Sequence, residues 1–207
     1  MEGLEELRPG LWRWTAPHPD WRPSPPGSPG DWEEDVGCVL YVTDRSAVFF
    51  DPLLPSAPAR FWRVLDRCVR GKERIAVLTT IAWHRRSRDA VAERYGATTS
   101  RARASLPAGV ESIPIRGAGE TMFWLPEHRA LVAGDRILGG KRGGLRLCPD
   151  SWLRYLPSKI TQSELADLLR PLLALPIELV LVSHGKPVLR RGRSALERAL
   201  AQAPSAA

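Results

Sequence analysis

The sequence contains few cysteines, and none of them are paired. Cys38, Cys68 and Cys148 lie far apart, and no Cys-x-x-Cys pair occurs in the 207 residues. This spacing argues against a disulfide framework and against a zinc site built from cysteine thiolates. Unpaired thiols are typical of a reducing compartment, so we expect a cytoplasmic protein.

Long apolar runs are absent as well. No stretch approaches the ~20 apolar residues that cross a bilayer. The acidic start, residues 1–7, lacks the basic-then-apolar pattern of a secretory signal. We therefore expect no membrane segment. A hydrophobic content of 43% in a chain of this length is enough for one sizeable core, so we expect a single domain over residues 1–207.

Acidic residues are fewer than basic ones, 23 against 30, and the formal net charge is +7. Such a surplus favours the binding of nucleic acid or of anionic substrates. The arginines, however, are dispersed and cluster only at residues 85–88 and 190–193. General enrichment in arginine explains this distribution better, so we do not expect nucleic acid as a partner.

The hydrophobic periodicity changes between strand-like and helix-like along the chain. Strands are predicted over residues 11–14, 36–42, 47–51, 75–80, 112–115, 120–125, 129–133 and 179–183. Helices are predicted over residues 58–70, 87–95, 161–175 and 193–202. Thr161 and Glu164 form a capping box at the third helix, and residues 203–207 are expected to fray. This order predicts an α/β protein with two sheets packed face to face and helices outside.

Residues 16–35 contain six prolines and predict a long surface loop. Two interpretations of its Trp21 and Trp32 stay open. The tryptophans either contribute to a functional site or anchor the loop to the body of the protein. His18, in the same loop, lies either at the mouth of a site or in solvent. The loop and its aromatic residues are also compatible with a homodimer.

Several short motifs follow one another in a particular order. Residues 48–52 are a strand ending in Asp-Pro, and residues 77–80 read Val-Leu-Thr-Thr. A hairpin over residues 120–135 ends in Gly-Asp, and residues 182–185 read Val-Ser-His-Gly. In this order the motifs resemble the metallo-β-lactamase superfamily, over about residues 11–189. The resemblance implies an αββα sandwich of two mixed sheets and a metal-dependent hydrolytic site.

The family places a His-x-His-x-Asp-His motif directly after the Leu-Thr strand, where its side chains converge on two metal ions. Alignment with the end of this strand puts Thr80, Ala82, His84 and Arg85 at the ligand positions. Alanine has no ligand atom, and arginine does not lose its proton. A further family histidine falls near Arg116 or Gly117 and is also missing. The usual two-metal site is therefore not expected.

Some family positions nevertheless keep residues that bind metals. The resemblance implies that Asp135 is the bridging carboxylate and His184 the last ligand, while His84 replaces the family's aspartate. His84, Asp135 and His184 are therefore the candidate catalytic and metal-binding residues for a single zinc or ferrous ion. Asp51 is a candidate for orienting these ligands from outside the metal site.

Three interpretations of the site stay open. In the first, no cofactor binds, and Arg85 or Arg116 neutralises Asp135 by ion pairing. In the second, one metal ion activates water for attack on a carbonyl or phosphoryl centre. In the third, an ordinary metal site is hidden by a shifted alignment.

Cationic side chains near the site favour a small anionic molecule as ligand. Arg85, Arg116 and Lys141 are the candidate substrate-binding residues. The segment around Lys141, residues 139–144, is rich in glycine but lacks the spacing of a phosphate-binding Walker loop. We expect a hydrolase-like protein that is inactive as a two-metal enzyme, with a mononuclear hydrolase or a non-catalytic binding protein as alternatives. His128, in a hairpin turn, is expected at the surface.

Overall fold

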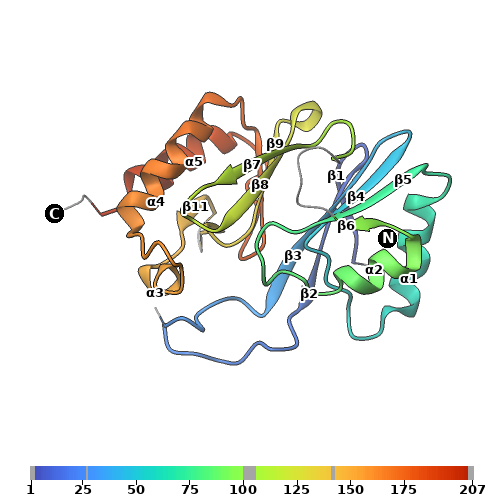
Figure 1. The fold of residues 1–207 in the computed structure, drawn as a ribbon, viewed down its shortest axis with the longest axis horizontal. Coiled ribbons are helices and arrows are strands. Elements are labelled where there is room, and N and C mark those ends of the chain that lie inside the picture. The colour runs from blue at the N-terminus through green and yellow to red at the C-terminus, as the bar shows by residue number, and fades with distance from the viewer. Residues whose placement is uncertain (1–2, 27, 100–105, 141–142, 205–207) are drawn as a thin grey trace.

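Two β-sheets packed face to face form the centre of the molecule (Figure 1). The computed structural model describes residues 3–26, 28–99, 106–140 and 143–204. The first sheet has the strand order β1-β2-β3-β4-β5-β6, with bounds Glu5–Arg8, Leu11–Pro17, Asp35–Val42, Ser46–Phe50, Arg74–Leu78 and Thr98–Thr99. The second sheet has the order β12-β9-β8-β7, with bounds Leu179–Val182, Ala130–Ala133, Glu120–Leu125 and Glu111–Ile115. Both sheets contain parallel and antiparallel pairs.

The alternation of side chains along a strand defines the layers. In β4, Ala47 and Phe49 belong to the core beneath the helices, whereas Val48 and Phe50 belong to the core between the sheets. Successive side chains of a strand point to opposite faces, so one strand supplies both cores. Because both faces of β4 are covered, its apolar run is continuous rather than alternating.

Helices cover the outer face of each sheet. α1 (Pro58–Val69) and α2 (Arg88–Tyr95) lie on the first sheet, and α4 (Gln162–Leu169) and α5 (Gly192–Ala201) lie on the second (Figure 1). In α1, Phe61, Val64 and Leu65 recur at helical spacing, are buried and pack against the sheet. The predicted arrangement of two mixed sheets between outer helices is confirmed.

The periodicity missed the shortest elements. These are β1, β6, β10 (Ile137–Gly139), β11 (Leu145–Leu147) and α3 (Asp150–Leu153), which are too short to repeat a pattern. The helix predicted over residues 161–175 is α-helical only to Leu169. Pro171 has no N–H for the helical hydrogen bond, and residues Arg170–Ala174 form a 3₁₀ helix instead. Residues 205–207 of the tail expected to fray lie outside the described residues.

The turn between β8 and β9 was predicted to expose His128, and this prediction is wrong. His128 is buried, with its ring edge against Tyr41 at a centroid distance of 5.4 Å. Arg8 Nη1 donates to the His128 carbonyl oxygen at 2.7 Å. Contacts with β1 and β3 cover the turn, and a sequence pattern confined to the hairpin does not contain them.

The carboxyl ends of the central strands meet at one edge of the sandwich. β4 runs parallel to β5, and β9 runs parallel to β12. Isolated bridges between Val36 and His184 and between Ile81 and Glu120 join the two sheets at this edge. Polar residues that follow β4, β5, β9 and β12 therefore converge, although they are distant in sequence. Within the described part of the chain, no helix is long and apolar enough to span a bilayer.

The capping box at α4 gives a direct test of the local stability of the fold. Thr161 Oγ1 accepts from the Glu164 backbone N–H at 3.2 Å, and the Thr161 N–H donates to Glu164 Oε2 at 2.8 Å. We expect Thr161→Ala to lower the free energy of unfolding by about 1 kcal/mol, because the cap is lost. Thr161→Ser, which keeps the hydroxyl, should stay close to wild type in the same denaturant titration. Equal losses in both variants would contradict a role for the cap.

Candidate metal centre

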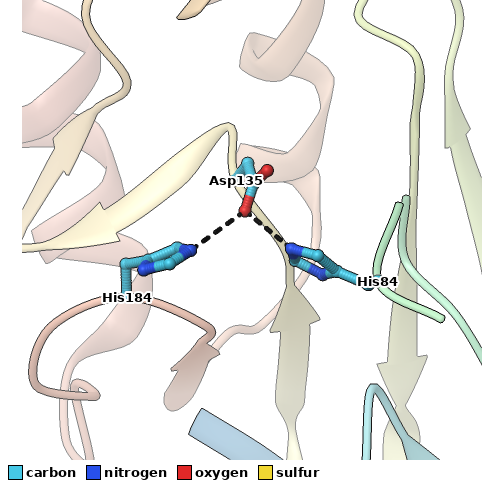
Figure 2. A group of neighbouring side chains, drawn as sticks. All are labelled: His84, Asp135 and His184. Atoms are coloured by element: carbon cyan, nitrogen blue, oxygen red, sulfur yellow. Dashed lines mark ion pairs between the residues drawn. The ribbon is translucent and has the colours of Figure 1, made fainter. Parts of the chain in front are cut away.

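Three buried side chains from three separate segments meet at this edge of the sandwich. His84 follows β5, Asp135 follows β9 and His184 follows β12. His84 Nε2 lies 3.0 Å from Asp135 Oδ1, and His184 Nε2 lies 3.4 Å from the same oxygen. Figure 2 shows the two imidazole rings turned toward Asp135 from either side. Each residue offers one ligand atom, and these atoms all lie within 4.8 Å of one another.

Asp51 holds His84 from the side away from Asp135. Asp51 Oδ2 lies 2.9 Å from His84 Nδ1, and the Thr80 backbone N–H donates to Asp51 Oδ1 at 2.8 Å. Asp51 itself has a φ of 46°, a left-handed conformation that is unusual outside glycine. Burial alone would raise the pKa of Asp51, but the neighbouring His84 outweighs burial and keeps that pKa below its usual value. His84 is thus placed between two carboxylates.

The close contact of His84 and Asp135 shifts the pKa values of both residues. Burial disfavours the charged form of His84, but the charges of Asp135 and Asp51 prevail and raise its pKa to about 9. Burial likewise opposes ionisation of Asp135, yet His84 and His184 hold its pKa well below the usual range. Asp135 is therefore a carboxylate at neutral pH. Its second oxygen, Oδ2, accepts a hydrogen bond from Trp83 Nε1 at 2.8 Å.

The pairing of Asp135 with Arg85 or Arg116, which was one of three open interpretations, does not occur. Both arginines are exposed, and the described ion-pair partners of Asp135 are His84 and His184. The cation that reaches the site is Arg86, whose φ of 40° bends the chain after His84. Its Nη1 donates to the carbonyl oxygens of Gly37 and Asp51, and its Nη2 lies 3.4 Å from His84 Nε2. The difference of one residue arises from backbone conformation, which the alignment did not contain.

Glu120 fixes the backbone that carries Asp135. Its carboxylate accepts hydrogen bonds from the backbone N–H groups of Gly134, Asp135 and Arg136, at 2.8, 2.9 and 2.9 Å. Burial and the nearby charge of Asp135 raise the pKa of Glu120 to about 7. The sequence analysis missed this residue, although an acid that starts an otherwise apolar strand is a usable signal.

A cavity of about 470 Å³ opens above the three residues. Its lining is His18, Asp20, Pro29, Trp32, Trp83, His84, Arg86, Asp135, Arg136, Trp152, Tyr155 and His184. Trp32 stands edge-on to His184, with ring centroids 5.4 Å apart, and His18 stands edge-on to Trp32. The proline-rich loop therefore supplies part of the wall. Of the two interpretations of its tryptophans, Trp32 fits the first, while Trp21 donates to the Trp32 carbonyl oxygen and anchors the loop.

The cavity differs from the predicted substrate site in its cations. Arg85 and Arg116 are not part of its lining, and Lys141 lies outside the described residues. Arg86 and Arg136 take their place, together with Trp83, Trp152 and Tyr155, none of which the sequence analysis had selected as a site residue. Because Arg136 directly follows Asp135, the sequence places it near the site. It does not show that the Arg136 side chain reaches the cavity.

The fold of this chain is found in solved structures, although its sequence has no match among known families. The sequence matches no protein-family model and no curated protein. Solved structures do match, among them a metallo-β-lactamase from Erythrobacter litoralis in its mono-zinc form, at 16% identity, 96% coverage of this chain, 94% of the other and a TM-score of 0.62. The chain has the metallo-β-lactamase fold.

Two further structures support the same fold. VMB-1 shares 13% identity over 96% of this chain and 94% of its own, with a TM-score of 0.61. A metallo-β-lactamase family protein from Thermus thermophilus shares 16% identity over 95% of this chain and 80% of its own, with a TM-score of 0.53. At such identities the likeness concerns the fold, and the function must be argued from the site.

The residues present fit one divalent metal ion. Two imidazole nitrogens and one carboxylate oxygen are a common ligand set for zinc or ferrous iron, with a position left open for substrate. A carboxylate can only accept, so the contact with Asp51 requires a proton on His84 Nδ1 and leaves Nε2 as the ligand atom. The pKa of about 9 places a proton on Nε2 as well at neutral pH, and a metal ion would bind there by displacing it. Asp135 Oδ1 is buried and makes no hydrogen bond to the described residues. The fit requires that His84 Nε2 lose its proton and that Arg86 Nη2 give up its long contact with this nitrogen.

Both carboxylate oxygens of Glu120 accept backbone N–H groups, so glutamine would turn its NH₂ group toward a buried N–H donor. We therefore expect Glu120→Gln to lower the free energy of unfolding by about 1–3 kcal/mol. Denaturant unfolding measures this loss. Glu111→Gln, at the exposed start of β7, is the matched control and should change stability by less than about 0.5 kcal/mol. Equal stability of the two variants would show that Glu120 does not hold the Asp135 segment.

Proposed function

We propose that this protein is a mononuclear metal-dependent hydrolase, with one ion held by His84, Asp135 and His184. The observation that carries the proposal is the convergence of their ligand atoms within 4.8 Å, in a buried position at the base of a cavity. Zinc and ferrous iron are the ions that suit two imidazoles and one carboxylate. Water-excluding walls on one side and a ligand-sized opening on the other favour catalysis rather than a purely structural ion.

The neighbouring residues support a single ion rather than a pair. Thr80 uses its hydroxyl to donate to Asp51, and Ala82 is exposed and carries no ligand atom. Arg86, a permanent cation, stands beside His84 on the cavity wall. A second divalent ion near this guanidinium would meet like charge and lack ligands.

Residues around the three ligands have separate roles in such a site. Asp51 orients the His84 ring, Glu120 holds the Asp135 backbone, and Trp83 holds the second oxygen of Asp135. A divalent ion bound there supplies a Lewis acid that polarises a carbonyl or phosphoryl oxygen and activates water. Arg86 is close enough to stabilise negative charge that develops on a substrate in the cavity.

A second function is favoured by a specific contact. Without an ion, a protonated His84 forms ion pairs with both Asp51 and Asp135, and Arg86 donates to the carbonyl oxygens of Gly37 and Asp51 beside it. In this state the buried carboxylates are compensated by protein groups alone. A protein that binds a small anion without catalysis would use the cavity in this form.

Metal content distinguishes the two functions. In protein purified without chelators, we expect elemental mass spectrometry to find about one zinc or iron per chain. His184→Ala should remove most of this metal, because one of its three ligands is lost. His128→Ala removes a buried histidine at the opposite end of the sandwich and should retain the metal. Wild-type protein without metal, even after incubation with zinc or ferrous iron, would favour the binding protein instead.

Hydrolysis is tested on the same preparations. We expect wild-type protein to hydrolyse an activated ester such as nitrophenyl acetate, to lose this activity with a chelator and to regain it with the metal. His184→Ala should be inactive, and His128→Ala active. Loaded protein that fails to hydrolyse activated esters, thioesters and phosphodiesters would contradict the proposed enzyme while leaving the metal site intact.

Asp51→Asn tests the support of His84. An amide in place of the carboxylate is a weaker acceptor for the Nδ1 proton, so we expect metal affinity to fall about 10–100-fold. Competition with a chromophoric chelator measures this change. Asp66→Asn is the matched control, because Asp66 pairs with Arg94 on the outer surface of α1 and α2. Unchanged affinity in Asp51→Asn would remove Asp51 from the metal site.

A further inference from the structure

Arg136 is a fully buried cation without a carboxylate partner. Its side chain is 0% exposed, and it forms no ion pair within 4.0 Å with any described residue. Nε donates to the Ala118 carbonyl oxygen at 2.7 Å, and Nη1 has only a long contact with Cys148 Sγ at 3.9 Å. Nη2 has no hydrogen-bond partner among the described residues. A buried charge in this state is costly unless an anion compensates it.

Glu120, which accepts from the Arg136 backbone, and Asp135, its neighbour in sequence, are already engaged. Glu120 accepts three backbone N–H groups, one of them from Arg136 itself. Asp135 faces two histidines and Trp83. The free N–H group of Arg136 therefore lacks a protein acceptor, and Arg136 lines the cavity above the candidate metal centre.

Other donors on the same wall are also left over. Arg86 Nε and Trp152 Nε1 are buried without a hydrogen-bond partner among the described residues, and both residues line the cavity. Arg86 uses its remaining nitrogens on two carbonyl oxygens and His84, and it forms no ion pair with the described acids. Two guanidinium groups and an indole N–H at the cavity thus have buried donors without an acceptor among the described residues. A carboxylate matches these donors, because it has acceptors only.

The rest of the cavity is aromatic. Trp32, Trp83, Trp152 and Tyr155 line it, and Trp83 and Tyr155 remain 56% and 74% exposed at its rim. The Trp83 ring covers the Arg136 guanidinium, with 5.7 Å between Cζ and the ring centroid. Flat apolar walls of this kind favour a ring, which stacks on them and loses little conformational freedom.

We propose that the cavity binds a ring-bearing carboxylate, with its carboxylate at Arg86 and Arg136 and its ring against Trp32, Trp83 and Trp152. The inference rests on the proposed function in taking this cavity as the substrate site. It names the substrate class: an aromatic or similarly flat acid that carries a hydrolysable group. Binding of the acid itself depends on the cavity wall and not on the ion.

Three probes of one shape separate charge from ring. Naphthoate carries the carboxylate, naphthylmethanol is neutral and naphthylmethylammonium is cationic. By isothermal titration calorimetry we expect naphthoate to bind about tenfold or more tightly than either of the others, since charge-assisted hydrogen bonds to two guanidinium groups distinguish them. Acetate, which lacks the ring, should bind weakly. Equal affinity for naphthoate and naphthylmethanol would overturn the proposal.

A matched pair of variants locates the carboxylate. Arg86→Met should weaken naphthoate binding about tenfold and leave naphthylmethanol little changed, whereas Arg85→Met, one residue away and outside the cavity, should change neither. Arg136→Met should act like Arg86→Met. If its melting curve shows that it does not fold, Arg136→Lys and the Arg86 and Arg85 pair decide the matter. Equal effects of Arg86→Met and Arg85→Met would contradict the assignment.

The ring is tested separately. Trp83→Ala should weaken the binding of naphthoate and naphthylmethanol alike, because both lose the stacking surface. Trp62→Ala, in α1 and outside the cavity lining, is the control and should change neither. Unchanged naphthylmethanol binding in Trp83→Ala would show that the ring does not contact Trp83.

The two proposals fail in different ways. If no metal is found and naphthoate still binds through Arg86, the hydrolase fails and the ligand class stands. If metal and ester hydrolysis are present but naphthoate does not bind or inhibit, the ligand class fails and the hydrolase stands. The His184→Ala protein, measured in parallel, should still bind naphthoate because it keeps both guanidinium groups.

Discussion

A carboxylate buried as deeply as that of Asp135 must be compensated by cations, hydrogen-bond donors or a metal ion. His84 and His184 face one of its oxygens, and Trp83 donates to the other. These partners follow strands of both sheets, so they reach Asp135 only when the sheets pack with their strand ends at one edge. The site therefore forms only when the two sheets pack together. Loss of either sheet's position would leave the charge of Asp135 uncompensated.

Support for this carboxylate comes from further buried acids. Asp51 holds His84, and Glu120 holds the backbone of residues 134–136. Each acid accepts hydrogen bonds from backbone N–H groups at strand ends, where the sheets leave such groups unpaired. The polar network is accordingly continuous from the strand ends to the cavity. Asp51 orients the His84 ring in this way, whereas the His184 ring packs edge-on against Trp32 and Trp152.

Two of the many arginines, Arg86 and Arg136, line the cavity. A net charge of +7 by itself indicates only arginine enrichment, and most arginines lie on the outside. Arg86 and Arg136 differ because they are turned inward and lack carboxylate partners among the described residues. The proline-rich loop contributes Trp32 and His18 to the same cavity. Guanidinium groups and aromatic rings in one cavity favour a ligand that carries both a carboxylate and a ring.

The sequence predicted the layers and the order of elements, because the continuous apolar run of β4, the helical spacing of α1 and the capping box at Thr161 are local signals. It also singled out His84, Asp135 and His184, since each follows a strand and the resemblance orders those strands. Which cation enters the site depends on the folded backbone. A φ of 40° turns Arg86 inward and leaves Arg85 in solvent, and no sequence pattern contains that angle. The burial of His128, Glu120 and Arg136 could not be predicted either. It depends on contacts between segments far apart in the chain, which local periodicity does not indicate.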